Sequence, residues 1–172
     1  MKRFWVPLLL TFLFVFESLF VQLVPGDLFK EGYVFVPRFL IISIFFLTMY
    51  GSVKHGLIYG FIFGLLYDMV YTEIIGIYLF MFPLGAYIFS GFMRILQTNI
   101  LVVSFVSIIC VALLEAGVYE MNLLIHITDM DFSSFSKIRL IPTLILNLVF
   151  IILSAYPLKR LFEKFSDSLR ND

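Results

Sequence analysis

The chain has 172 residues, of which 62% are hydrophobic and 14% are charged, and its mean hydropathy is +1.05. About a quarter of the residues in a soluble domain are charged, so this composition excludes a soluble globular protein. Lys and Arg balance Asp and Glu at 12 each, and no nucleic-acid partner is expected. The sequence predicts a polytopic integral membrane protein with almost no extramembrane domain.

Apolar runs of about 20 residues mark membrane-spanning helices. Six segments meet or approach this length, and they predict an all-α protein with six transmembrane helices. The predicted spans are residues 4–24, 37–53, 56–71, 76–93, 99–125 and 140–158. No small-residue cleavage site follows the first span, so we interpret it as a retained anchor and not as a signal peptide.

The second and third segments are short, at roughly 16 residues each, and fit either two spans or a re-entrant hairpin. Cytoplasmic segments are enriched in Lys and Arg, and a hairpin would expose Lys54 outside. We therefore predict six spans with both termini in the cytoplasm. The basic residues expected inside are Lys2, Arg3, Lys54, Arg94, Lys159, Arg160, Lys164 and Arg170, and those expected outside are Lys30, Arg38, Lys137 and Arg139.

Residues 1–172 are expected to form one membrane domain, with external loops at 25–36 and 126–139 and a cytoplasmic tail at 159–172. The tail has apolar residues at helical spacing with cations beside them. Two interpretations fit this pattern. The tail is either a short amphipathic helix lying on an anionic inner leaflet, or the frayed end of the last span with its basic anchor.

Glycines recur along the third predicted span. Gly56, Gly60, Gly64 and Asp68 follow one another at intervals of four residues, so they share one helix face. A glycine face lets another helix approach closely. The face either packs within the chain, with Asp68 capping a neighbouring helix, or it binds a partner or acts as a gate together with Asp68.

Three carboxylates, those of Glu17, Asp68 and Glu115, fall within predicted spans, where an ionised side chain costs roughly 3 kcal/mol. At a rise of about 1.5 Å per residue, all three lie in the outer half of the membrane. Arg38 and Arg139 lie at the external boundary, and their side chains are long enough to reach inward. We expect an outer-leaflet polar cluster in which these acids are partnered by Arg38 or Arg139, with the individual pairings left open.

Other residues offer little chemistry. His55 and His126 are predicted on opposite sides of the membrane, so they cannot share a metal ion. Cys110 is the single cysteine, which excludes a disulfide framework and a cysteine-based metal site. The sequence has no phosphate-binding glycine loop and no nucleophile beside a histidine. We expect no metal, no cofactor and no enzymatic activity.

The stretch around Asp68 resembles a known family. A glycine-rich short span ends in "GLLYD", the break "MVYTEIIG" follows, and the next span begins "IYLFMFPLGAYI". This resembles the MreD family of rod shape-determining proteins, whose pattern is Gly-x-x-x-Asp followed within about eight residues by a glycine that opens the next span. Gly64, Asp68 and Gly76 occupy those positions. The break is bulkier than the small residues and proline that the family often has.

The resemblance implies a non-enzymatic scaffold in the bacterial cytoplasmic membrane that maintains rod shape. Its implied partners are the single-span protein MreC, the actin-like MreB, and a peptidoglycan polymerase with its penicillin-binding transpeptidase. The family is similar in architecture to the substrate-capture subunits of energy-coupling-factor vitamin transporters, and such a subunit is the alternative function. Those subunits carry Ala-x-x-x-Ala on their first helix, whereas the first span of this chain has no alanine and no glycine.

Overall fold

The computed structural model describes residues 4–23, 32–72, 74–96 and 98–170, and these residues form helices joined by short connections. Lys2, Arg3 and Lys30, together with loop residues 25–31 and tail residues 171–172, lie outside the described residues. In chain order the elements are α1 (Trp5–Leu23), α2 (Phe39–Phe46), the π-helix η3 (Leu47–Gly51), α3 (Val53–Tyr71), α4 (Ile77–Ile95), α5 (Ile100–Leu124), α6 (Phe132–Phe135), the π-helix η4 (Ser136–Leu140) and α7 (Ile141–Arg170).

Within the described residues, five helices are long and apolar enough to cross a membrane. They are α1, α3, α4, α5 and the continuous helix Phe132–Arg170 that joins α6, η4 and α7. Large apolar side chains on their outer faces are exposed, among them Phe105 and Leu153, as expected for surfaces that face lipid. The prediction of an all-α, multi-pass integral membrane protein is confirmed.

The second predicted span, residues 37–53, has a different structure. Before α3 begins at Val53, its helical segments are the eight-residue α2 and the five-residue η3. Every residue of α2 is buried, so this helix is surrounded by protein and not by lipid. A short apolar run of this length is more typical of a buried core helix than of a membrane span. Hydropathy alone does not separate these two environments.

The predicted tail is a continuation of the last membrane helix. Helix α7 runs to Arg170 without a break at Pro157, and Phe162 and Phe165 are buried. The ring of Phe165 packs edge-on against His55 at the start of α3, with 5.2 Å between ring centroids. The apolar face of the tail therefore packs on the protein. This differs from both predicted alternatives, a helix on the lipid surface and a frayed end.

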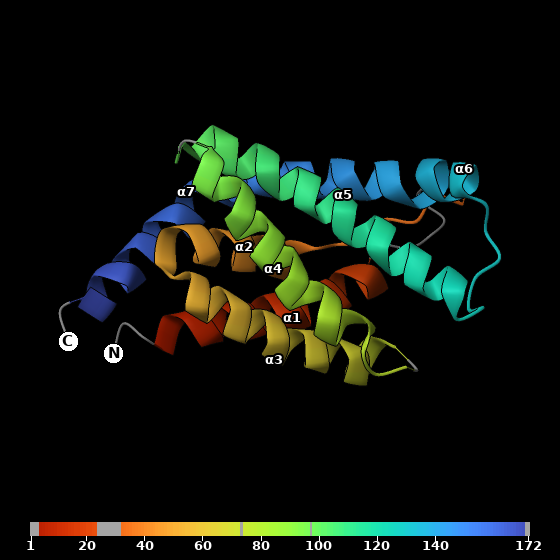
Figure 1. Ribbon diagram of the computed structural model, residues 1–172, viewed down its shortest axis with the longest axis horizontal. Helices are drawn as coiled ribbons and strands as arrows, with labels where there is room; N and C mark the ends of the chain where they lie inside the picture. The colour runs from red at the N-terminus through yellow and green to blue at the C-terminus, as the bar shows by residue number, and fades with distance from the viewer. Residues whose placement is uncertain (1–3, 24–31, 73, 97, 171–172) are drawn as a thin grey trace.

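The helices have their ends at two opposite sides of the molecule (Figure 1). The start of α1 and the end of α7 lie together on the left of the view, whereas the α3–α4 turn and the α5–α6 connection lie on the right. We call the right side the polar end, because Glu17, Asp68 and Glu115 all fall in the parts of α1, α3 and α5 that are nearest to it.

The glycine face of α3 is filled by the chain itself. A Cβ atom at Gly64 would overlap the carbonyl oxygen of Tyr78 in α4, and one at Gly60 would lie 3.3 Å from the backbone of Pro83. A Cβ atom at Gly56 would overlap the side chain of Thr48 in η3. Helix α3 therefore approaches α4 backbone to backbone, which is the use that small residues have in membrane helix pairs.

We predict that Gly64→Ala destabilises the protein, because the new methyl group meets the rigid backbone of α4 and not a movable side chain. The expected loss in the free energy of unfolding is about 1–3 kcal/mol. Gly91→Ala is the matched control, since a Cβ atom there meets nothing within 4 Å. Thermal unfolding in detergent measures both. A Gly64→Ala midpoint equal to that of Gly91→Ala would contradict the close packing of α3 on α4.

Candidate functional site

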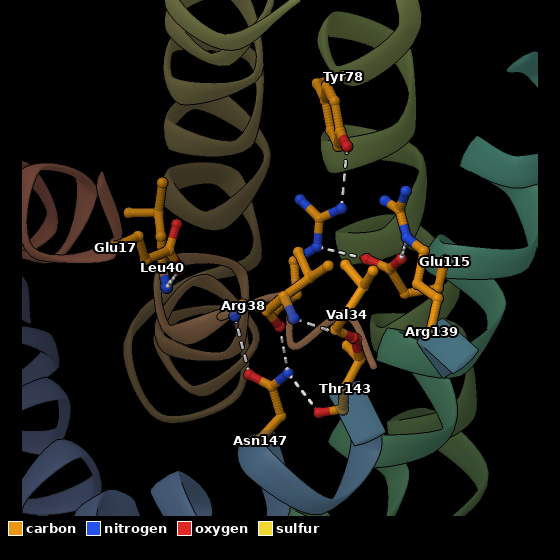
Figure 2. A network of polar contacts seen from close by, with 10 residues as sticks. Glu17, Val34, Arg38, Leu40, Tyr78, Glu115, Arg139, Thr143 and Asn147 are labelled. Carbon is orange, nitrogen blue, oxygen red and sulfur yellow. Dashed lines mark hydrogen bonds and ion pairs between the residues drawn. The ribbon is translucent and has the colours of Figure 1, made fainter. Parts of the chain in front are cut away.

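An ion-pair cluster lies at the polar end (Figure 2). Glu115 of α5 is fully buried and receives two guanidinium groups, with Arg38 Nε at 2.5 Å and Arg139 Nε at 3.1 Å. The side chain of Arg38 is 1% exposed, whereas that of Arg139 is 31% exposed. For Glu115 the sequence therefore predicted the right class of partner, and the structure pairs it with both arginines.

Arg38 has further partners that complete its burial. Its Nη2 donates to the Tyr78 hydroxyl of α4 at 2.9 Å, and its backbone N–H donates to Asn147 Oδ1 of α7 at 2.8 Å. Hydrogen bonds to a charged group are stronger than those between neutral groups, and a buried charge without them is strongly destabilising. A single residue thus connects the start of α2 with α4, α5 and α7.

The chain before α2 is extended, and α7 and η4 supply its missing hydrogen bonds. The backbone N–H of Val36 donates to Thr143 Oγ1 at 3.1 Å, and Asn147 Nδ2 donates to the Val36 carbonyl at 3.0 Å. The N–H of Val34 donates to the carbonyl of Ile138 at 2.8 Å. Sequence analysis missed Thr143 and Asn147. Their signal was two polar side chains four residues apart in an apolar helix, where polar groups are costly without partners.

Asp68 has no arginine partner in the described part of the chain, so the expectation that one of the two arginines would partner it is wrong. Its carboxylate accepts the backbone N–H groups of Gly76 and Leu79 at Oδ2 and that of Tyr78 at Oδ1, at 2.8–2.9 Å. These N–H groups begin α4, where they have no partner within the helix. Gly76 has φ +131°, a conformation that L side chains rarely adopt. Asp68 therefore caps α4, as one of the two sequence alternatives held.

Glu17 likewise forms no ion pair within the described residues. Its Oε1 accepts the backbone N–H of Leu40 at 2.8 Å in the first turn of α2. Its Oε2 is buried and has no hydrogen-bond partner among the described residues. Burying a polar atom without a partner costs free energy, so this oxygen is available to a donor from outside the chain.

A cavity of about 310 Å³ lies beside Glu17 at the polar end. It is bounded by the second half of α1, the extended segment before α2, the end of α3 and Tyr78. The lining residues are Glu17, Ser18, Val21, Gln22, Val36, Pro37, Arg38, Tyr67, Tyr71, Thr72 and Tyr78. The site thus combines an apolar wall with hydroxyls, an amide and one carboxylate oxygen that lacks a partner.

A family model and a curated relative both relate the chain to the same protein family. A family model described as "rod shape-determining protein MreD" matches residues 2–165. The chain is also 37% identical over 172 residues to the rod shape-determining protein MreD of Bacillus subtilis (strain 168), and the match covers 100% of both chains. No solved structure matches the chain.

We predict that Asp68→Ala lowers the free energy of unfolding by about 2 kcal/mol or more, because three backbone donors at the start of α4 lose their acceptor. Asp68→Asn should be intermediate, since one amide oxygen serves only one side of the cap. Asp129→Ala removes an exposed carboxylate and is the matched control. Chemical unfolding in detergent ranks the three variants. The cap is ruled out if Asp68→Ala is as stable as the control.

We predict that the charged residues of the ion-pair cluster contribute unequally to the free energy of unfolding. Glu115→Gln leaves the buried Arg38 without a counter-charge and should cost about 3–5 kcal/mol of unfolding free energy. Arg139→Gln should cost less than about 1 kcal/mol, because Arg139 is partly solvated and Glu115 keeps Arg38. The double variant Arg38→Met with Glu115→Leu should be less destabilised than Glu115→Gln. Equal losses for Glu115→Gln and Arg139→Gln in the same unfolding assay would contradict this account.

Proposed function

The chain belongs to the MreD family of rod shape-determining proteins, and on this premise we propose that it is a non-enzymatic scaffold of the bacterial cell-wall elongation complex. It binds the single-span protein MreC and helps organise the peptidoglycan synthases. MreB and the polymerase–transpeptidase pair are partners through MreC or by direct contact. The protein resides in the cytoplasmic membrane with both termini inside, so its polar end faces outward.

The main support for this proposal is Glu17 Oε2, which is buried beside the cavity at the polar end and has no hydrogen-bond partner among the described residues. A segment of a partner that brings one hydrogen-bond donor and an apolar side chain would match the lining. The donor would satisfy Oε2, and the apolar group would cover the wall formed by Val21, Val36 and Pro37. We expect the region of MreC where it leaves the membrane to supply this segment.

The bonding of the other charged groups supports a scaffold over an enzyme. Glu115 is held by two arginines, and both oxygens of Asp68 accept backbone N–H groups. General acid–base catalysis requires a group that is free to exchange a proton with a substrate. These carboxylates have structural partners instead, and they lock helices in place.

We predict that Glu17→Leu lowers recovery of MreC about tenfold, because loss of one hydrogen bond to the buried carboxyl group costs on the order of 1 kcal/mol. The measurement is the amount of MreC that co-purifies with the tagged protein in mild detergent, normalised to its level in the membrane. Glu120→Leu removes an exposed acid of α5 outside the cavity and is the matched control.

Glu17→Gln separates binding from folding, because its amide oxygen still accepts the Leu40 N–H while an NH2 group replaces the unpartnered oxygen. Full recovery of MreC by both Glu17 variants would overturn the proposed contact. Recovery of a vitamin and an ATPase pair in place of MreC would instead identify the transporter subunit. Nothing in α1 favours that outcome, because it has no alanine or glycine to form the docking face.

A further inference from the structure

A second cavity lies at the opposite end of the molecule, between the start of α1 and the last part of α7. Its volume is about 710 Å³, and its apolar lining includes Trp5, Val6, Pro157 and Leu161. Arg160 and Lys164 line the same cavity. We call it the basic groove. Its volume is within the range of pockets that enclose one small ligand.

The two cations of the basic groove are not neutralised by any residue that the structure describes. Arg160 and Lys164 are one helical turn apart and both are exposed. Arg160 donates to the Tyr156 hydroxyl, but neither cation forms an ion pair within the described residues. The neighbouring Lys159, by contrast, pairs with Glu163 at 3.8 Å. None of the described residues that line the groove is acidic, so this lining presents a net positive charge to a ligand.

The position of the groove along α7 matches a membrane surface. Roughly 20 residues separate the start of α7 from Arg160, which is about 30 Å and the thickness of the hydrocarbon core. Trp5 begins α1 at the same end of the molecule, and tryptophan is enriched at the membrane interface. Apolar lining and exposed cations therefore meet at the depth where lipid chains end and headgroups begin.

We propose that the basic groove binds one anionic phospholipid. An acyl chain lies against Val6, Pro157 and Leu161, and the phosphate contacts Arg160 and Lys164. Lys and Arg side chains near a membrane surface attract anionic headgroups, and this apolar lining suits a hydrocarbon chain. The inference does not rest on the proposed contact with MreC, which lies at the other end of the molecule.

The test uses Trp5, which is the single tryptophan of the chain and lines the groove. The full chain is reconstituted in phosphatidylcholine vesicles with small fractions of acyl-brominated phosphatidylglycerol or acyl-brominated phosphatidylcholine. Bromine quenches tryptophan fluorescence on contact. We expect the relative association constant of the anionic lipid to exceed that of the zwitterionic lipid about tenfold.

Matched variants locate the site. Lys164→Gln should reduce the preference for phosphatidylglycerol severalfold, and Arg160→Gln with Lys164→Gln should abolish it. Lys159→Gln removes a lysine of the same helix outside the groove and should keep it. Equal quenching by both lipids in the unmodified chain overturns the proposal, as does a preference that survives the double variant. Absence of quenching by either lipid also overturns it and assigns the groove to a protein segment.

Discussion

A buried guanidinium sets the constraint on which the polar end depends. Arg38 is 1% exposed in a protein that crosses the membrane, where water does not supply missing hydrogen bonds. Glu115 neutralises its charge, Tyr78 accepts from it, and Asn147 accepts from its backbone N–H. These partners come from α5, α4 and α7. Displacing any one of these helices would leave a polar group unsatisfied, so the cluster fixes their relative positions.

The same constraint accounts for the short α2. The chain enters α2 as an extended segment, and an extended segment does not satisfy its own backbone. Thr143 and Asn147 of α7 supply part of what is missing, which anchors this segment inside the bundle. Helix α2 therefore starts within the protein and is enclosed on every side. Enclosure by protein selects the same apolar residues as contact with lipid, and the sequence pattern of the two is alike.

This explains which parts of the structure could be predicted. The long helices could be predicted, because the thickness of the bilayer sets the length of an apolar membrane-spanning segment. The ends of α1, α4 and α5 fall within two residues of the predicted spans. An ion pair between an acid of the spans and Arg38 or Arg139 was predictable as a class of interaction, but the choice of Glu115 as the acid was not. A helix cap by Asp68 was one of two alternatives from the sequence, but the individual backbone partners of Asp68 and Glu17 were not predictable, because a backbone N–H group leaves no residue-specific mark in the sequence.

Asp68 and Glu17 are both carboxylates within predicted spans, but they differ in how many of their oxygens lack a hydrogen-bond partner. Both oxygens of Asp68 accept hydrogen bonds at the start of α4, so its bonding is complete within the chain. Glu17 uses one oxygen on the first turn of α2 and keeps the other unpartnered. A partner that donates to this oxygen would also stabilise the carboxyl group that holds the first turn of α2. Glu17 contacts α2 at Leu40, which is two residues after Arg38. Partner binding and folding of the polar end are then linked. Each process favours the other by the same coupling free energy. If the proposed contact forms, the polar end is therefore most stable when the partner is bound.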